Sequence, residues 1–334
     1  MGYSQYIKEI GRGAAGAKDL GYEEAHTLYG AMLDGGVPDL ELGAIVLALR
    51  VKGESVDEMR GFLQAAAERS FAMRPPYGRP APVVLPSYNG SRREANLTPL
   101  LALLLHRFGV PVVVHGLLEG HGRVTTAQIF RELGIMPCVG VETAQRRLEE
   151  DGIVFVPTAS LSPGLATLLA LRSRMGVRNS AHSLVKMLNP FKDAGVLVGA
   201  ATHPDFIDLM RDLLCAVGGR ALLLRATEGE PFANPKRRPR IEYLHAGAAQ
   251  VLFEAQHESL TSLPHLPAAA DAAHTAQWVR QVLDQHLPIP APIANQLACC
   301  LYASGYADSL NQAKAIVAVE GNFSGHLESN RPTH

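Results

Sequence analysis

The sequence predicts an α/β protein in which an N-terminal α-helical domain precedes a largely parallel central sheet. Over the first 70 residues, apolar side chains recur at helical spacing and the connections are short, as in a small helical bundle. Beyond residue 82, short and almost fully apolar runs alternate with helical segments, which is typical of parallel strands covered on both faces. The chain has 334 residues, 47% of them hydrophobic, which is enough for about two domains with sizeable cores.

Three helices are predicted in the N-terminal part. The first covers 22–33, and the second covers 40–51 after Pro38, a residue that suits a helix start. The third begins at Ser55-Val56-Asp57-Glu58, a capping box in which the serine and glutamate side chains each satisfy a free backbone N–H group. One face of the second helix carries four apolar residues, Leu40, Ala44, Leu47 and Val51.

The α/β part is predicted from five short apolar runs, each followed by a loop and a helical segment. The predicted strands are 83–85, 110–114, 153–156, 196–198 and 221–224. The predicted helices are 97–108, 125–133, 161–175, 180–188, 275–287, 291–303 and 310–319. Residues 226–245 are polar and rich in proline, and residues 257–274 are expected to form a loop.

Overall composition gives no direct sign of a charged partner. The chain has 31 Lys and Arg and 32 Asp and Glu residues, a formal net charge of −1. None of the four cysteines belongs to a Cys-x-x-Cys pair, so reduced thiols in a cytoplasm are expected. The N-terminus lacks the apolar segment of a signal peptide, and the longest apolar run is far shorter than the ~20 residues of a membrane span. We therefore expect a cytoplasmic protein with no membrane partner.

The distribution of charge is more informative than its sum. Residues 171–192 contain five cations and no acid, and residues 236–240 contain four cations in five positions. The cations concerned are Arg172, Arg174, Arg178, Lys186 and Lys192, then Lys236, Arg237, Arg238 and Arg240. A single basic run is usually a solvated surface. Two acid-free clusters favour a site for phosphate groups, either on a small ligand or on nucleic acid.

Two loops that follow predicted strands indicate a cleft. Residues 87–93 follow the first strand, and His115-Gly116 end the second, with Thr125 leading into the next helix. In parallel sheets, ligands bind where strands end and helices begin, because free N–H groups there attract anions. The alternative is that both loops are only turns. His115 is the histidine placed best for chemistry, although a single histidine is more often structural.

Glu228 and Glu230 lie two residues apart, a spacing at which both carboxylates could hold Mg²⁺ together with phosphate oxygens. The alternative is a solvated acidic turn or a partner for the basic run at 236–240. No Ser/His/Asp or Cys/His arrangement for nucleophilic catalysis is visible.

Several segments resemble one enzyme family. Residues 35–39, 44–54 and 57–61 are similar to the helical domain of anthranilate phosphoribosyltransferases, which the related pyrimidine nucleoside phosphorylases share. Residues 174–190 resemble that family's segment built around G-x-R-T and N-P. The resemblance implies a nucleoside phosphorylase/phosphoribosyltransferase-like fold with a cleft between two domains, and a homodimer formed through the helical domain. The implied domains are 1–72, joined in space by helices near 161–190, and an α/β domain made of 76–160 and 191–330.

The catalytic motifs depart from the family. The phosphate loop G-T-G-G-D reads Ser-Tyr-Asn-Gly-Ser at 87–91, and N-[IV]-S-T reads Asn-Leu-Thr-Pro at 96–99. K-H-G-N-R reads Val-His-Gly-Leu-Leu at 114–118, and the metal motif D-E is replaced by Glu-Gly-Glu at 228–230. Transfer from phosphoribosyl diphosphate needs Mg²⁺, backbone amides and cations around the leaving group, so these losses weaken the case for catalysis.

This pattern resembles the YbiB-type branch of the family, whose members bind nucleic acid without sequence preference. Residues 225–231, followed by the basic run, also resemble that branch. The resemblance implies a homodimer that binds DNA or RNA and needs no cofactor. Phosphate contacts are expected from Arg172, Arg174, Arg178, Lys186, Lys236, Arg237, Arg238 and Arg240. A vestigial phosphate cleft is expected at Ser87, Asn89, Gly90, Arg92, Asn96, Thr98, His115, Gly116, Arg123 and Thr125.

Two alternatives stay open. One is an active phosphoribosyltransferase that uses phosphoribosyl diphosphate, an amine acceptor such as anthranilate, and Mg²⁺ held by Glu228 and Glu230. The other is a vestigial cleft that binds a small phosphate ligand as a regulator. Aromatic residues make up only 6% of the chain, which favours contacts to the nucleic-acid backbone over base stacking.

Overall fold

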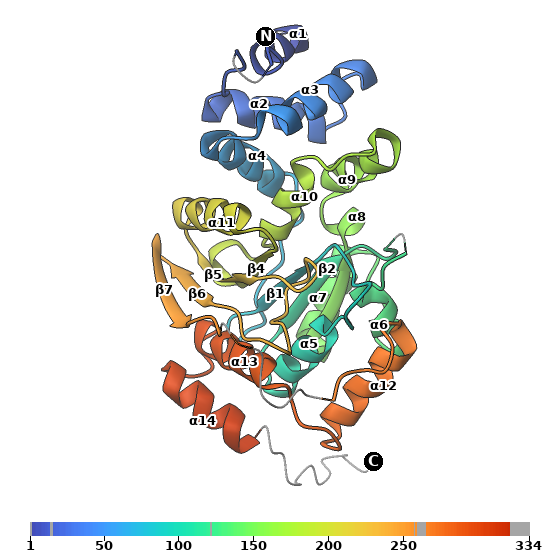
Figure 1. The fold of residues 1–334 in the computed structure, drawn as a ribbon, viewed down its shortest axis with the longest axis vertical. Helices are drawn as coiled ribbons and strands as arrows, with labels where there is room; N and C mark the ends of the chain where they lie inside the picture. Colours follow the sequence, from blue (N-terminus) through green and yellow to red (C-terminus); the bar gives the residue numbers. More distant parts are fainter. Residues whose placement is uncertain (1, 14–15, 121, 257, 259–264, 321–334) are drawn as a thin grey trace.

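The computed structural model describes residues 2–13, 16–120, 122–256, 258 and 265–320, and places a helical bundle on one side of a covered sheet (Figure 1). The α-helices are α1 (Tyr3–Ile10), α2 (Tyr22–Leu33), α3 (Asp39–Lys52), α4 (Val56–Glu68), α5 (Thr98–Arg107), α6 (Thr126–Glu132), α7 (Val141–Asp151), α8 (Thr158–Leu161), α9 (Pro163–Met175), α10 (Ala181–Leu184), α11 (Pro204–Val217), α12 (Ala272–Leu283), α13 (Ala291–Ala303) and α14 (Leu310–Glu320). The strands are β1 (Val83–Ser87), β2 (Val112–Gly116), β3 (Ile153–Pro157), β4 (Val196–Ala201), β5 (Arg220–Arg225), β6 (Ile241–His245) and β7 (Ala248–Phe253).

The sheet has the strand order β3-β2-β1-β4-β5-β6-β7, in which the first five strands are parallel and the last two antiparallel. This arrangement confirms the predicted largely parallel sheet, and each of the five predicted strands is present. The hairpin of β6 and β7 is a correction, because no strand was predicted after β5. The prolines and charges that precede Ile241 hide the short strand that begins there.

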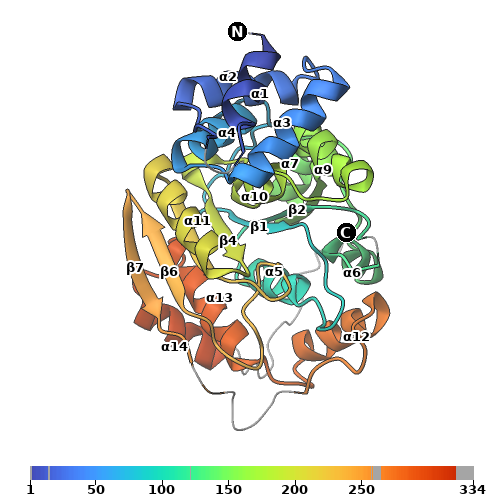
Figure 2. The ribbon, with the colours of Figure 1, turned by 45° about the horizontal axis from the view of Figure 1, so that its top comes forward.

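Successive residues of each strand point into two separate cores. Val84 and Val113 pack with Leu213 of α11 on the face toward the N-terminal helices. Leu85 and Val114 pack with α5 and α13 on the opposite face. Fully apolar strands are thereby buried on both sides, as the sequence predicts. Figures 1 and 2 show α10 and α11 between the N-terminal bundle and the sheet, so the first core runs from the sheet into the bundle.

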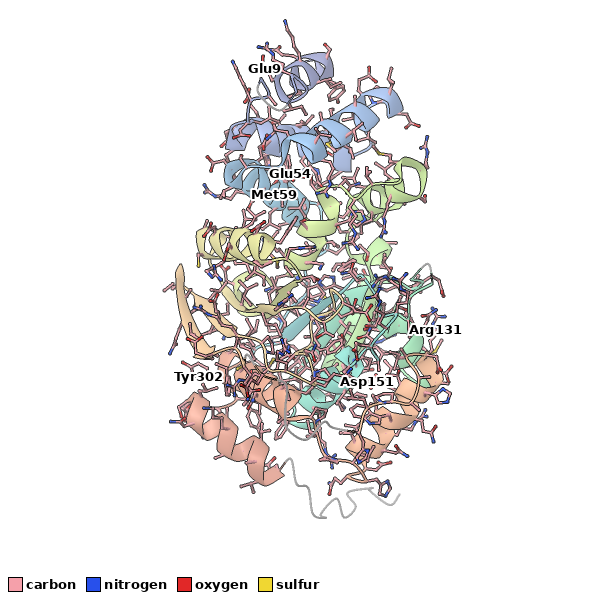
Figure 3. All side chains as sticks on the ribbon, viewed as in Figure 1. Glu9, Glu54, Met59, Arg131, Asp151 and Tyr302 are labelled. Atoms are coloured by element: carbon pink, nitrogen blue, oxygen red, sulfur yellow. The ribbon has the colours of Figure 1, made fainter. Side chains whose placement is uncertain are left out.

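The N-terminal helices form as predicted, and the capping box of α4 is confirmed. Ser55 Oγ accepts the N–H of Glu58 at 3.2 Å, and the Glu58 carboxylate accepts the N–H of Ser55 at 2.8 Å. Helices α2 and α4 approach closely at Gly61, where a Cβ atom would stand 2.5 Å from the Tyr22 carbonyl oxygen. Glu54, labelled in Figure 3, lies between α3 and α4 and accepts a hydrogen bond from Ser180.

The apolar face predicted on α3 is not the buried one. Ile45, Val46 and Leu49 are buried against the bundle. The face that carries Leu40, Leu47 and Val51 is exposed, at 83%, 48% and 69% of the respective side chains. The helix has apolar residues on more than one face, and its buried face is the one that packs with α1.

Two predicted helices are interrupted. The predicted helix 161–175 divides at Ser162-Pro163 into α8 and α9, and 180–188 becomes α10 followed by a 3₁₀ turn. Helix α9 begins against the end of α2, since a Cβ on Gly164 would stand 2.6 Å from the Leu33 carbonyl oxygen. The domain division itself stays a prediction.

The four cysteines are free thiols, and three of them are buried, as predicted. Within the described ranges, every helix is too short or too polar to cross a lipid bilayer.

Candidate functional site

The first residues of the predicted phosphate cleft form a tight loop at the carboxyl end of β1. The chain turns at Gly90, which has a φ of +62° and no room for a Cβ atom, since one would lie 2.9 Å from the Val124 carbonyl oxygen. Only glycine fits such a left-handed and crowded position. A bridge between Ser91 and Val124 fixes the far side of the loop.

The loop is occupied by the carboxylate of Glu230, which is fully buried. Its Oε1 accepts the N–H groups of Asn89 and Gly90, both at 2.8 Å. Its Oε2 accepts the Ser87 hydroxyl hydrogen. The same oxygen lies 3.4 Å from both Asn96 Nδ2 and Thr98 Oγ1. Five predicted cleft residues therefore meet, but they meet on a side chain of the protein itself.

The carboxylate of Glu228 is held in the same manner. It accepts the N–H groups of Arg92, Arg93 and Glu94 at 3.1, 2.7 and 2.7 Å, and Arg123 Nη1 lies 3.4 Å away. Burial alone would raise the pKa of Glu228, but these donors outweigh it and leave the pKa lowered.

In the described part of the chain, neither carboxylate belongs to a cluster of side chains that could bind a metal ion. Among the described residues, no group of three or more His, Cys, Asp and Glu side chains could hold a metal ion. The oxygens of Glu228 and Glu230 instead accept hydrogen bonds from N–H and O–H donors, and Glu228 also pairs with Arg123. The geometry gives the Mg²⁺ prediction no support.

His115 is a structural residue. Its Nε2 lies 3.0 Å from the Leu188 carbonyl oxygen and its Nδ1 lies 2.6 Å from the Tyr88 hydroxyl oxygen. A carbonyl only accepts, so Nε2 carries the proton and Nδ1 accepts from Tyr88. Burial lowers the pKa of His115 to about 4, which keeps the ring neutral. The neighbouring Gly116 is required by packing, since a Cβ there would lie 1.8 Å from the Ser87 carbonyl oxygen.

Thr125 caps α6. Its hydroxyl oxygen accepts the N–H of Gln128 at 3.2 Å at the start of α6, and its own hydrogen is donated to the Leu118 carbonyl. The same capping pattern is visible in the sequence, where a threonine stands three residues before a glutamine.

Cations line two adjoining hollows between the helical bundle and the sheet. A hollow of about 330 Å³ is lined by Arg123, Arg172, Arg178 and His182. A second hollow of about 200 Å³ shares Arg178 and His182 with it and adds Arg50 and Lys186. Burial, followed by the charges of Arg172, Arg123 and Arg50, lowers the pKa of Arg178, as expected where like charges gather.

A larger hollow continues this band of positive charge. It measures about 730 Å³ and shares Thr202 with the second hollow. Its cations are Arg211, Arg225, Lys236, Arg237, Arg238 and Arg240. Its acids are Glu94, Glu228 and Glu242. We call the three hollows together the cationic groove.

In the fold, several cations of the two basic clusters pair with acidic residues that lie outside those clusters in the sequence. Arg174 pairs with Asp39 at 3.3 Å, Lys236 with Glu94 at 2.8 Å, and Arg240 with Glu242 at 2.7 Å. Lys186 lies inside the groove, where its ammonium is 3.3 Å from the Gly229 carbonyl oxygen and burial lowers its pKa to about 8. The structure brings both clusters to one groove, with the exception of Arg174 and Lys192, which are not among the lining residues.

Sequence reasoning missed Arg50, Arg211 and Arg225 as lining residues of the groove. Arg225 ends β5, so the rule that ligand groups follow parallel strands could have found it. Arg50 on α3 and Arg211 on α11 lie outside any basic run, so no sequence pattern marks them as site residues. Within the described ranges, Arg172, Arg178 and Arg225 form no ion pair.

The fold and this site define the class of protein. The chain belongs to the anthranilate phosphoribosyltransferase-like family, also known as glycosyltransferase family 3. Residues 4–70 match the helical bundle domain of a glycosyl transferase family.

The particular relatives divide into two kinds. The uncharacterized protein YbiB of Escherichia coli (strain K12) is 46% identical over 318 residues, covering 95% of this chain and 99% of YbiB. An anthranilate phosphoribosyltransferase of Methanopyrus kandleri is 25% identical, covering 88% of this chain and 89% of the enzyme. The crystal structure of the Thermus thermophilus anthranilate phosphoribosyltransferase superposes with a TM-score of 0.75 at 22% identity, covering 96% of this chain and 94% of that one, and shows the shared fold.

Proposed function

We propose that this protein is a homodimer that binds the sugar–phosphate backbone of DNA or RNA along the cationic groove, without reading base sequence. The observation that carries the proposal is the adjacency of the three hollows. The first and second share Asn89, Arg178 and His182, and the second and the larger one share Thr202. A band of cations this long matches a chain of phosphates better than a single small anion.

The unpaired cations favour the same ligand. Arg172, Arg178 and Arg225 are exposed and form no ion pair among the described residues. Clustered like charges are costly until an anion neutralises them, so phosphate binding would relieve the repulsion around Arg178. The pairs at Lys236 and Arg240 are half exposed, at 39% and 51% of the side chains, and could exchange a carboxylate for a phosphate at little cost.

The loop that would receive a diphosphate argues against the enzymatic alternative. Glu230 takes up the N–H groups of Asn89 and Gly90, and Glu228 takes up those of Arg92, Arg93 and Glu94. Two negative carboxylates there would repel a diphosphate leaving group. The donors that catalysis would need are already satisfied.

The dimer is proposed to form through α3. The exposed apolar face of this helix carries Leu40, Leu47 and Val51. Burying such a face against another apolar surface removes it from water and is favourable. A second copy of the chain supplies the same face by two-fold symmetry. The dimer would carry two grooves and so double the number of phosphates in reach.

Charge reversal tests the proposal. We expect Arg172→Glu/Arg178→Glu to weaken binding of a random-sequence oligonucleotide at least about tenfold in fluorescence anisotropy, since each lost phosphate contact removes counterion release. Arg146→Glu on α7 makes the same type of charge change at an exposed residue that does not line the groove, and should change binding little. Equal losses from the groove and α7 variants, allowing for the number of charges changed, would contradict the groove.

A fluorescence assay of anthranilate with phosphoribosyl diphosphate and Mg²⁺ separates the enzymatic alternative. The proposal predicts no turnover. Turnover that is lost in Glu228→Gln would support the enzyme and contradict the view that this carboxylate only occupies the loop.

A further inference from the structure

The two lysines that line the cationic groove differ in their partners. Lys236 pairs with Glu94 at 2.8 Å, whereas Lys186 forms no ion pair with any residue in the described ranges. The Nζ atom of Lys186 instead donates to two backbone carbonyl oxygens, at 3.4 Å to Ala200 and 3.3 Å to Gly229. A carbonyl oxygen accepts a hydrogen bond from a neutral amine as well as from an ammonium. These contacts therefore do not fix the amine of Lys186 in its charged form.

The surroundings of Lys186 favour the neutral amine. Burial lowers the pKa of Lys186, the negative charge of Glu230 opposes this shift, and the positive charge of Arg178 adds to it, so that the pKa is about 8. A lysine that is desolvated beside another cation is a typical nucleophile, because the uncharged amine is the form that attacks a carbonyl carbon. The other charged or titratable residues that line the same hollow are Arg50, Glu54, His182 and His203.

The hollow around Lys186 has the size and lining for a sugar. Its volume is about 200 Å³, below the roughly 300–1,000 Å³ of pockets that hold drug-sized ligands. Phe206 and Met210 line it with apolar side chains, and Asn89 and Ser183 offer hydrogen bonds to hydroxyl groups. The hollow thus suits one sugar of a nucleic-acid backbone better than a whole nucleoside.

The cations of the groove are placed to hold the phosphates beside such a sugar. Arg178 lines both this hollow and the neighbouring one and is exposed, whereas Lys186 is partly buried. A phosphate bound at Arg178 therefore leaves the amine of Lys186 to face the sugar next to it.

We propose that Lys186 is a nucleophile that forms a Schiff base with an abasic sugar, when nucleic acid that has lost a base lies in the cationic groove. An abasic sugar opens to an aldehyde at C1′ and keeps a phosphate on each side. A bond forms between Nζ of Lys186 and the aldehyde carbon, and the carbonyl oxygen leaves as water with the two hydrogens of the amine. The reaction rests on the proposed binding of nucleic acid and adds a covalent step with one damaged form of that ligand.

Reductive trapping tests the reaction. The wild-type protein is incubated with an oligonucleotide that contains one abasic site, and sodium cyanoborohydride delivers hydride to the imine carbon and leaves a stable secondary amine. We expect a covalent complex on a denaturing gel, and mass spectrometry should place the sugar remnant on Lys186. A remnant on Lys236 or on another lysine would overturn the proposal.

Lys186→Arg keeps the positive charge and removes the nucleophile. At protein concentrations where anisotropy shows the abasic oligonucleotide to be fully bound, we expect this variant to give at least about tenfold less covalent complex than the wild-type protein. Lys192→Arg is the matched control, because Lys192 is exposed and does not line the groove, and it should trap like the wild-type protein. Equal trapping by Lys186→Arg and Lys192→Arg would contradict the role of Lys186.

Labelling of the wild-type protein with acetic anhydride, without nucleic acid, covers the case in which Lys186→Arg fails to fold. The rate of acetylation at Lys186, read by mass spectrometry at a series of pH values, should be half-maximal near the pKa of about 8. An ordinary lysine has a pKa of about 10.4, and a midpoint there would overturn the proposal.

An intact oligonucleotide of the same length separates this reaction from the binding on which it rests. If the intact and abasic oligonucleotides both bind but the abasic one is not trapped, only the covalent step fails. If neither oligonucleotide binds at low salt, the proposed nucleic-acid binding fails and the covalent step fails with it.

Discussion

Tyr88 donates its hydroxyl hydrogen to Nδ1 of His115 across 2.6 Å, and both side chains are buried. The bond joins the loop that follows β1 to the end of β2, and the other ring nitrogen of His115 continues the chain to the Leu188 carbonyl. A neutral histidine thus ties three segments together and holds the loop in position.

The burial of the neutral His115 ring predicts a loss of stability in acid. The pKa of His115 is about 4 in the folded protein and about 6.5 in an unfolded chain, so the unfolded state binds the proton first. Stability from this group is full above pH 6.5 and is lost as the pH falls toward 4, by at most about 3 kcal/mol. Urea unfolding at a series of pH values measures the slope. His115→Gln should flatten it, although His182, whose pKa is also lowered to about 4, keeps part of it. An unchanged slope in the glutamine variant would contradict the assignment.

A second prediction concerns the turn at Gly229. Gly229→Ala adds a Cβ that collides with Asn89 at a backbone φ of +93°, so we expect a loss of about 2–4 kcal/mol from strain and displacement. Gly176→Ala is the control, because its φ is +75° in the left-handed helical region but no atom lies within 4 Å of the added Cβ. It should cost only about 1–2 kcal/mol. Equal losses in denaturant titrations would show that the fit to Asn89 does not matter.

The third prediction concerns assembly. Sedimentation should show a dimer for the wild-type protein and a monomer for Leu47→Glu, because a charge on the exposed face of α3 opposes burial. Val139→Glu places the same charge on an apolar residue that is 81% exposed outside α3, and should leave the dimer intact. A monomeric wild-type protein, or a dimer that survives Leu47→Glu, would contradict the proposal that the chain dimerises through α3.

Sequence reasoning predicted the elements better than the contacts between them. The strand at 83–87 and the cap at Ser55 are encoded by neighbouring residues, so a local pattern is enough. Gly90 donates its N–H to Glu230, which lies 140 positions away in the sequence. No local sequence pattern can predict such a contact. Arg174 appeared free for the same reason, since its partner Asp39 belongs to a different helix. Basic clusters could be counted from the sequence, but only the fold brings Arg50 and Arg178 to the same hollow.

The salt dependence of oligonucleotide binding tests the central claim most directly. If phosphates bind along the cationic groove, the logarithm of the association constant should fall linearly with the logarithm of salt concentration, by about 0.9 for each phosphate contacted on duplex DNA or about 0.7 on a single strand. We expect a slope that corresponds to several phosphates, and a shallower slope for Arg172→Glu/Arg178→Glu. A binding constant that does not change with salt, or no binding at low salt, would contradict the account.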